Sequence, residues 1–257
     1  MTKSSTELKR CARLDLNGNY GISMLVLIVN GMLPSLLLFP FSRNVSETNS
    51  LFQNLSYFLA VLIISFISTI LSCGVIRFHV RLAKEENRQF SDIFAGFKNY
   101  PQKIIGAYLL LYARIVLVLL PGCVLSVTAL STSVFTAPLI GLSLILLIAG
   151  IIWGIKISLQ YALIFYLFMD NPEMSVQRLF SESKELMNGN KLRLLYLSLS
   201  FIGMYLLGLL SFGIGLLWVT PYVNQTYAQF YLTVLREKQA RNSFEPSEQM
   251  DSPFSEN

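Results

Sequence analysis

The sequence predicts an all-α protein: a polytopic transmembrane helical bundle with six spans, cytoplasmic interfacial amphipathic helices and both termini in the cytoplasm. Composition is the first of three observations behind this prediction. The 257 residues are 53% hydrophobic and only 14% charged, with a mean hydropathy of +0.54. Soluble globular chains carry roughly 25% charged residues, so lipid must solvate much of this surface. The other two observations are the number of long apolar runs and the placement of the basic residues.

Six apolar runs are long enough to cross a bilayer, which takes about 20 helical residues. The first run contains Asn30 and Pro34 and lacks a small-x-small cleavage site, so we interpret it as a retained span rather than a signal peptide. The third and fourth runs exceed the hydrocarbon thickness and should tilt or project beyond it. The fifth and sixth are continuous, and we expect a hairpin between them at 211–216 (SFGIGL). The predicted spans are 21–41, 52–76, 104–130, 138–168, 193–213 and 215–235.

Lysine and arginine predict the orientation, because cytoplasmic loops carry an excess of both. Of the 20 Lys and Arg residues, all except Arg43, Arg114 and Lys156 lie before run one, between runs two and three, between runs four and five, or after run six. Both termini should therefore face the cytoplasm. The chain has a net charge of +5, and its basic loops should lie close to anionic headgroups of the inner leaflet. We expect residues 1–236 to form a single transmembrane domain and 237–257 to be a polar, disordered cytoplasmic tail.

Three basic segments are each expected to hold a short helix on the inner membrane surface, with the apolar face towards the lipid. At the N-terminus, Ser4 and Glu7 have the spacing of a capping box. Further on, Asp170-Asn171-Pro172-Glu173 has the features of a helix start. Apolar residues then recur at helical spacing: Leu8, Ala12 and Leu16 in the first segment; Phe90, Ile93, Phe94 and Phe97 in the second; Val176, Leu179, Phe180, Leu186 and Met187 in the third.

The same junction follows the first and the third of these segments: LNGNY at 16–20 and MNGNK at 187–191. Gly18 and Gly189 can adopt the left-handed conformation that ends a helix, so each junction should separate a surface helix from a span. In the middle segment Asn99-Tyr100-Pro101 should act in the same way. The chain can thus be divided into three units of about 85 residues. Such junctions also suit any six-span protein, and the sequence leaves a true triplication open.

Arg114 and Lys156 fall within predicted spans and form a candidate anion- or lipid-binding site. A charge at mid-bilayer costs about 2.5–3.5 kcal/mol on insertion scales, and no acidic residue lies in a predicted span to pair with either cation. In one interpretation both side chains reach up to cytoplasmic headgroups. In another they face a cavity and hold an anion such as a lipid phosphate. A third is hydrogen bonding to backbone carbonyls.

The sixth span is unusually polar for lipid, and its residues Tyr222, Gln225, Thr226 and Gln229 form a candidate polar face of the bundle. Such groups need partners inside the bundle or a wet cavity. A packed interior helix with interhelical hydrogen bonds is favoured over a face that lines a substrate path.

Four stretches together resemble the DUF975 family of integral membrane proteins, which is found mainly in Gram-positive bacteria. They are ELKRCARLDLNGNYG, GVIRFHVRLAKEENRQFSDIFAGF, ESKELMNGNKLRLLYLSLSFIG and PYVNQTYAQFY. The resemblance covers nearly the whole chain except the tail. It implies a multi-pass protein of the bacterial cytoplasmic membrane, and it brings no catalytic residues and no established activity.

No motif for a nucleotide, a metal protease, a serine hydrolase or a dinucleotide occurs, so we expect no enzyme activity and no catalytic residue. Cys11, Cys73 and Cys123 are far apart and His79 is the only histidine, so no metal or other cofactor is expected. His79 should be an interfacial side chain. We favour a non-enzymatic accessory or scaffold component of a bacterial membrane system, whose partners are the lipid bilayer and other membrane proteins, with no nucleic acid. The alternative is a carrier, exporter or lipid-handling protein that uses a site near Arg114 and Lys156.

Overall fold

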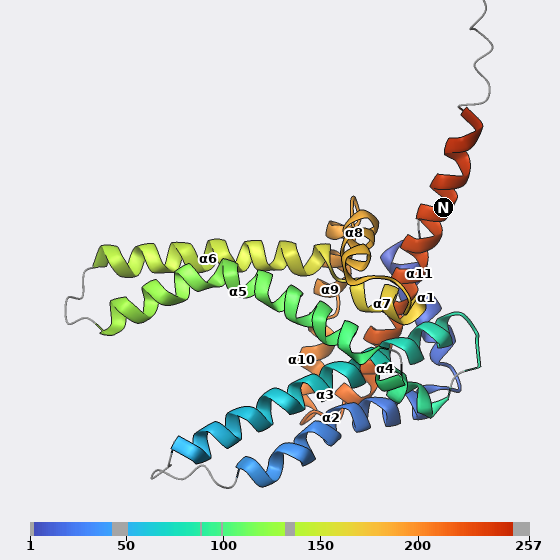
Figure 1. The fold of residues 1–257 in the computed structure, drawn as a ribbon. Coiled ribbons are helices and arrows are strands. Elements are labelled where there is room, and N and C mark those ends of the chain that lie inside the picture. Colours follow the sequence, from blue (N-terminus) through green and yellow to red (C-terminus); the bar gives the residue numbers. More distant parts are fainter. Residues whose placement is uncertain (1–2, 43–50, 88, 99, 132–136, 249–257) are drawn as a thin grey trace, which may run out of the picture.

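The computed structural model describes residues 3–42, 51–87, 89–98, 100–131 and 137–248, and the regular structure in these ranges is entirely helical (Figure 1). The long helices are α2 (Tyr20–Ser42), α3 (Leu51–Ala83), α5 (Pro101–Ser131), α6 (Ala137–Gln160) and α11 (Leu216–Glu248). The shorter ones are α1 (Ser5–Leu16), the 3₁₀ helix η1 (Phe90–Phe94), α4 (Ala95–Lys98), α7 (Ile164–Asp170), α8 (Val176–Leu186), α9 (Lys191–Leu199) and α10 (Ile202–Leu210).

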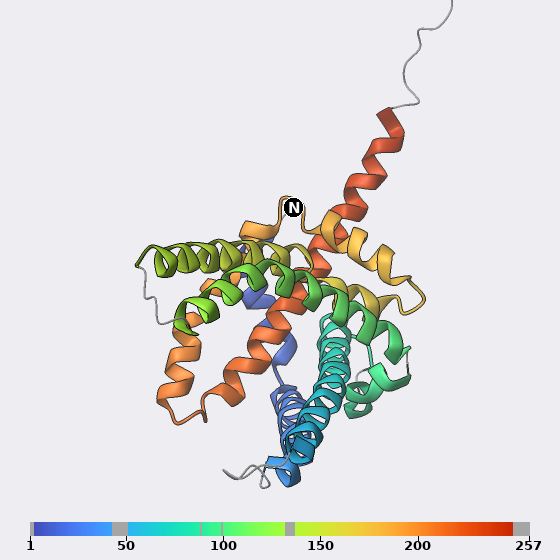
Figure 2. The ribbon, with the colours of Figure 1, turned by 60° about the vertical axis from the view of Figure 1, so that its left-hand side comes forward.

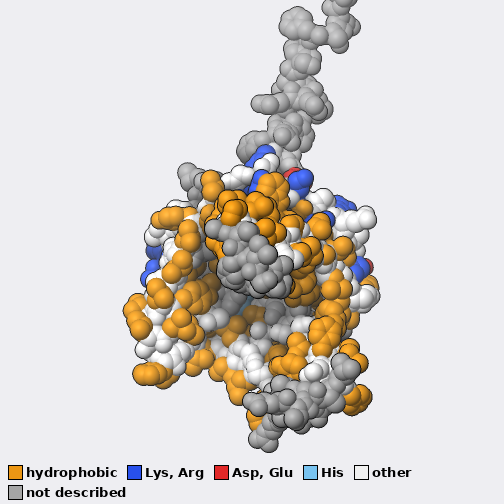
Figure 3. All heavy atoms as spheres, turned by 90° about the vertical axis from the view of Figure 1, so that its left-hand side faces the viewer, with side chains coloured by type: hydrophobic (Ala, Val, Ile, Leu, Met, Phe, Trp, Pro, Cys, Tyr) orange, Lys and Arg blue, Asp and Glu red, His pale blue; other side chains and the backbone are white. Residues whose placement is uncertain are grey.

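Three helical hairpins diverge from a shared base (Figures 1 and 2). They are α2 with α3, α5 with α6, and α9 and α10 with α11. The base contains the short helices α1, α7 and α8 and the middle of α11, whose C-terminal end projects beyond the base. Hydrophobic side chains cover the flanks of the hairpins, and the surface between them is hollowed (Figure 3). The hairpins are therefore held together mainly where they meet the base.

Among the described residues, five helical segments are long and apolar enough to cross a membrane: Tyr20–Phe41, Asn54–Ala83, Pro101–Ala129, Pro138–Asp170 and Lys191–Leu210. These match the first five predicted spans. The sixth predicted span, 215–235, is helical as part of α11 but is not among the apolar segments. The reason is its polar content, since Asn224, Gln225 and Gln229 interrupt it. The six crossings and the cytoplasmic termini stay predictions.

Helix α11 is the buried centre of the base. Its residues from Val219 to Val234 are buried or half-buried on every side. The apolar stripe of α1, formed by Leu8, Ala12 and Leu16, is fully buried, and α1 packs on α11 and α3. The stripe was predicted correctly, but its partner is protein rather than lipid. A helix as polar as α11 is stable here because its neighbours shield it and satisfy its side chains.

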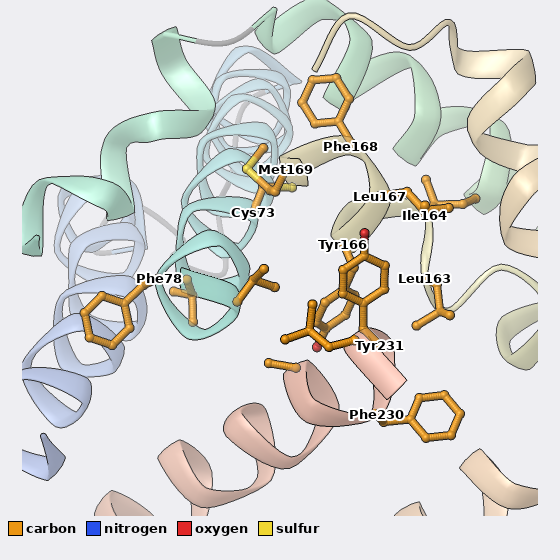
Figure 4. Packing of buried hydrophobic residues seen from close by; sticks show 14 of the residues in the cluster. Cys73, Phe78, Leu163, Ile164, Tyr166, Leu167, Phe168, Met169, Phe230 and Tyr231 are labelled. Atoms are coloured by element: carbon orange, nitrogen blue, oxygen red, sulfur yellow. The ribbon is translucent and has the colours of Figure 1, made fainter. Parts of the chain in front are cut away.

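The fourth apolar run is not one straight helix. Helix α6 ends at Gln160, and after a turn at Tyr161–Leu163 the chain continues as α7 into the base. The carbonyl of Gln160 accepts a hydrogen bond from Ser183 Oγ of α8 (3.2 Å), which satisfies one of the carbonyls freed at the helix end. Figure 4 shows α7 residues Tyr166 and Leu167 pointing into the core, with Tyr166 beside Tyr231 of α11. The extra length of this run therefore bends inward and does not tilt as a single rod.

The hairpin predicted at 211–216 is present. Phe212 and Gly213 have positive φ values of 55° and 84°, and the Ser211 hydroxyl accepts a hydrogen bond from the Gly215 amide (2.8 Å). The helix before it breaks into α9 and α10 near Ser200. Hydroxyls of Ser198 and Ser200 donate to the carbonyls of Leu194 and Leu197, and such bonds loosen a helix.

The capping box of α1 is confirmed: Ser4 Oγ accepts from the Glu7 amide, and Glu7 Oε2 accepts from the Ser4 amide. The predicted start of the third surface helix is wrong by several residues. Helix α8 begins at Val176, and its cap is Ser175, whose Oγ accepts from the Arg178 amide (3.4 Å). The segment 170–173 binds other elements instead, as described below.

The two NG junctions are confirmed and are alike in detail. Gly18 and Gly189 have φ values of 75° and 78°. In both, the following asparagine reaches back four residues, so that Asn19 Nδ2 donates to Asp15 O (2.8 Å) and Asn190 Nδ2 donates to Leu186 O (2.9 Å). The helix that follows starts two residues after each glycine.

Helices α1 and α8 correspond over their whole length. A constant offset of 171 residues relates their Ser caps, their glycines and their fully buried positions. The buried pairs are Leu8 and Leu179, Ala12 and Ser183, and Leu16 and Met187. The first and third units thus share one folded pattern, which goes beyond the common junction that the sequence revealed.

The middle unit departs from this pattern. The segment around Phe90–Phe97 was predicted as one amphipathic helix, but it forms η1 and the single turn α4. Ile93 is fully buried, whereas Phe94 and Phe97 are exposed. The segment lies against α3 so closely that a Cβ on Gly74 would stand 1.9 Å from the Ile93 carbonyl oxygen. This contact, together with the ion pairs of Asp92, opposes a regular helix here.

The predicted tail is partly structured. Helix α11 continues to Glu248, so 237–248 is helical rather than disordered, and 249–257 lies outside the described residues. Lys238 of this extension forms salt bridges with Glu182 (2.6 Å) and Glu185 (3.0 Å) of α8. Burial lowers the pKa of Lys238, but the hydrogen bonds to the two glutamates outweigh it and raise the pKa overall.

Candidate functional sites

The polar face of α11 is bound to α1 through one carboxylate. Asp15 Oδ2 accepts hydrogen bonds from Gln225 Nε2 (2.7 Å) and from Gln229 Nε2 (2.6 Å). Both glutamines are buried, and Asp15 is half-buried near the end of α1. The sequence did not identify Asp15, because it lies in the surface helix, outside every predicted span. A hydrogen bond to a charged acceptor contributes more stability than one to a neutral acceptor. These two hydrogen bonds therefore hold α1 against α11.

His79 extends this network into α3. Its Nδ1 lies 2.9 Å from Gln225 Oε1, and its side chain is 1% exposed. Because the Gln225 amide nitrogen already donates to Asp15, its oxygen faces His79, and Nδ1 is assigned as the donor. Among the described residues His79 Nε2 has no hydrogen-bond partner. The prediction of an interfacial side chain is wrong, since α3 is packed against α11 at this point.

The other two residues of the predicted polar face have local roles. Thr226 Oγ1 donates to the carbonyl of Tyr222 within α11 (2.7 Å). Tyr222 packs edge-on against Phe201 and lines a hollow of about 290 Å³ with Arg13 and Trp218. The fold thus brings Gln225 and Gln229 together with Asp15 and His79. Tyr222 instead packs against Phe201, and Thr226 hydrogen-bonds within α11.

A second polar cluster joins α3, α7 and α11 at Asp170. Tyr231 donates to Asp170 Oδ2 (3.0 Å), and Lys84 forms a salt bridge with Oδ1 of the same carboxylate. Beside it, Asp92 of η1 pairs with Arg81 (2.7 Å) and more distantly with Arg77 (3.7 Å). The basic residues after the second span, which the sequence assigned to headgroups, therefore also bind protein carboxylates.

The segment from Pro172 to Glu173 is tied to the start of α5. Lys103 Nζ donates to the carbonyls of Pro172 (3.0 Å) and Glu173 (3.3 Å). The Tyr100 hydroxyl donates to the Glu173 carboxylate at 3.1 and 3.2 Å. The hydrogen bond and the negative charge of Glu173 raise the pKa of Tyr100. These contacts explain why residues 170–173 do not start a helix.

Arg114 and Lys156 lie on neighbouring antiparallel helices, α5 and α6, and both are exposed. The Arg114 guanidinium lies over the rings of Phe180 (4.2 Å) and Tyr161 (4.9 Å), next to the surface helix α8. Lys156 Nζ lies over the ring of Trp153 (4.7 Å). Neither residue lines the large cavity described next. In the described chain no carboxylate forms a salt bridge with either.

A large cavity, of about 560 Å³, lies between the α5–α6 hairpin and helices α7, α9 and α11. Its lining is almost entirely apolar, and no sequence signal pointed to it. The lining residues are Ile115, Leu119, Ile151, Gly154, Ile155, Ser158, Leu159, Ala162, Leu163, Tyr166, Leu194, Leu195, Ser198, Tyr227 and Phe230.

The described residues offer no obvious metal centre. Within the ranges given above, no three His, Cys, Asp or Glu side chains come together in a way that could hold a metal ion. Cys11, Cys73 and Cys123 are free thiols.

Long helices that are apolar enough to cross a membrane, joined at an all-helical base, are the features of a multi-pass membrane protein. The chain belongs to the DUF975 family, described as a protein of unknown function, whose model matches residues 1–238. Neither the curated proteins nor the solved structures contain a match to it.

Proposed function

We propose that this protein is a non-enzymatic accessory or scaffold component of a bacterial membrane system. It is inserted in the cytoplasmic membrane with both termini inside. It binds transmembrane helices of partner proteins along the flanks of its hairpins. The observation that carries the proposal is the separation of the hairpins above a firmly joined base.

The α5–α6 hairpin supports this proposal most directly. Only 6% of the apolar stretch of α5 and 17% of the stretch that contains α6 are buried inside the protein. Leu117 of α5 and Ile145 of α6 are 72% and 64% exposed. In a lipid bilayer these exposed apolar faces contact either acyl chains or other transmembrane helices. A helix of complementary shape packs more closely on such a face than acyl chains do.

The base, by contrast, is fixed by contacts between distant segments. Arg193 at the start of α9 pairs with Glu237 of α11 (3.1 Å) and donates to the carbonyl of Lys3. Lys238 joins α11 to α8, and Asp15 joins α11 to α1. A rigid cytoplasmic platform with separate hairpins suits the holding of partners better than alternating access, which needs spans that enclose a path.

The carrier alternative has less support. It requires Arg114 and Lys156 to line a cavity that holds the substrate, but neither residue lines the large apolar cavity. The sequence also has no acidic residue deep in a predicted span that could couple transport to protons or sodium.

Site-specific photo-crosslinking in native membranes tests the proposal. A photoreactive residue at position 117 or 145 should give one and the same protein adduct, because both positions lie on the exposed α5–α6 hairpin. The same residue at position 184, on the exposed face of α8, is the control for the base. The proposal fails if the hairpin positions yield lipid adducts only.

A further inference from the structure

The hollow beside Tyr222 gathers one charged and several polar side chains between four helices. Its volume of about 290 Å³ is at the small end of ligand pockets. Its walls come from the last turn of α1, the start of α2, the middle of α10 and the first turns of α11. We call it the Arg13 hollow, and its lining residues are Arg13, Tyr20, Met204, Trp218, Val219 and Tyr222.

The polar groups of the Arg13 hollow can all donate hydrogen bonds. In the part of the chain that the structure describes, Arg13 forms no salt bridge and no hydrogen bond. Within the same ranges the hydroxyls of Tyr20 and Tyr222 have no hydrogen-bond partner either. Asp15, the carboxylate closest to Arg13 in the sequence, accepts from α11 instead. The hollow therefore offers a set of donors that complements a ligand rich in acceptors.

A second cation lies next to the hollow. Lys9 precedes Arg13 by one turn of α1, so the two side chains share a face of this helix. Lys9 Nζ lies 4.5 Å from the centre of the Phe201 ring, and Phe201 packs edge-on against Tyr222 of the hollow. Burial, and after it the positive charge of Arg13, lower the pKa of Lys9. The two like charges thus lie close enough to repel each other, and an anion in the hollow offsets that repulsion.

The position of the hollow favours a lipid over a soluble anion. Two of its walls belong to the segments Tyr20–Phe41 and Lys191–Leu210, which are apolar enough to cross a membrane. Trp218 is 54% exposed, so this wall reaches the surface of the protein. Tyr and Trp are enriched at the level of lipid headgroups, where the phosphates of a bilayer lie. An anion that approaches from this side is the head of a lipid.

We infer that the Arg13 hollow binds the phosphate group of an anionic phospholipid. The Arg13 guanidinium and the hydroxyls of Tyr20 and Tyr222 donate to the phosphate oxygens, and Lys9 adds to the positive potential. A zwitterionic head is disfavoured, because its ammonium group comes close to the same two cations. The inference goes beyond the proposed scaffold function and does not rest on it, since it concerns α1 and the third hairpin rather than the α5–α6 hairpin.

Lipid retention by the purified full-length protein tests the inference. The protein in detergent is mixed with equal amounts of dioleoylphosphatidylglycerol and dioleoylphosphatidylcholine, and bound lipid is counted by native mass spectrometry. The wild type should retain one phosphatidylglycerol in preference to phosphatidylcholine. Equal retention of the two lipids, or retention of neither, overturns the inference.

Glycerol phosphate distinguishes a lipid from a free anion, because it carries the phosphate without acyl chains. At the concentration of the lipid it should not displace bound phosphatidylglycerol. Displacement at this concentration would show a site for soluble anions and would overturn the assignment to a lipid.

Charge removal tests the contact with Arg13. Arg13→Gln should bind phosphatidylglycerol at least about tenfold more weakly, which is the effect of one lost hydrogen bond between charged groups. The variant should fold, because Arg13 is exposed. The matched control is Arg10→Gln, which removes the same charge from an exposed position of the same helix outside the hollow and should bind as the wild type does. Equal loss in both variants, or loss in neither, contradicts the proposed contact.

Hydroxyl removal tests the two tyrosines without a change of charge. Tyr20→Phe/Tyr222→Phe keeps both rings, so it should elute as the wild type does in size-exclusion chromatography. It should bind phosphatidylglycerol about tenfold more weakly, because two hydrogen bonds to the phosphate are lost. The control is Tyr112→Phe/Tyr196→Phe, which removes two exposed hydroxyls outside the hollow. Wild-type retention by Tyr20→Phe/Tyr222→Phe places the lipid elsewhere and overturns the inference.

Discussion

Asp15 shows how one residue outside the apolar runs controls a buried helix. Its Oδ2 atom accepts from Gln225 and Gln229, and Gln225 in turn contacts His79. The sequence alone indicated that the two glutamine amides need hydrogen-bond partners, because they lie within a predicted span. Their partner was not visible, because α1 precedes α11 by about two hundred residues and only the fold places them together.

Removal of this acceptor should destabilise the base. In Asp15→Leu two buried amide donors lose their partner, and each unsatisfied group costs about 1–3 kcal/mol. We expect a clearly lower melting temperature of the detergent-purified protein, followed by size-exclusion chromatography after heating. Asp15→Asn keeps an acceptor oxygen and should recover most of the loss. Equal melting of Asp15→Leu and wild type would show that the network adds nothing to stability.

At the scale of elements, local chemistry decided where the surface helices end. The capping box, the NG stops and the hairpin at 211–216 depend on residues within a few positions of one another, and the sequence predicted all three. The start of α8 and the middle unit were predicted incorrectly. There, contacts with distant segments compete with local preference: Asp170 with Lys84 and Tyr231, and Ile93 with Gly74.

The close approach of η1 to α3 can be tested at Gly74. A methyl group there would collide with the Ile93 backbone, so Gly74→Ala must displace η1 or bend α3, at a cost of about 1–3 kcal/mol or more. We expect faster proteolysis of the 84–100 segment and a lower melting temperature. Gly106→Ala is the control, because no atom lies within 4 Å of its Cβ; it should be neutral or slightly stabilising. Similar behaviour of the two variants would refute the tight contact.

For the whole molecule, the arrangement of hairpins on a basic platform predicts which segments share a side of the membrane. In a cysteine-free background, Phe212→Cys at the tip of the third hairpin should react with an impermeant thiol reagent added to intact cells. Phe212 is 98% exposed, so access is not limited by packing. Lys184→Cys on α8 should react only after the membrane is opened.

This experiment decides the fifth crossing, because the predicted span 193–213 lies between positions 184 and 212. Labelling of both positions from the same side would show that 193–213 does not cross. Arg241→Cys decides the sixth crossing, because it is an exposed position after 215–235. It should react only after the membrane is opened, and labelling in intact cells together with position 212 would show that 215–235 does not cross.

The sequence by itself determined that this chain is helical, apolar enough for a membrane, divided by repeated helix stops and a member of the DUF975 family. These properties follow from composition and from short-range patterns, which act without knowledge of the fold. The tertiary structure alone decided that α11 is a buried axis and that Asp15 and His79 meet its glutamines. It also revealed the apolar cavity between the α5–α6 hairpin and helices α7, α9 and α11. The physical reason is that burial and ion pairing join residues far apart in the chain, and such contacts leave no periodic trace in the sequence.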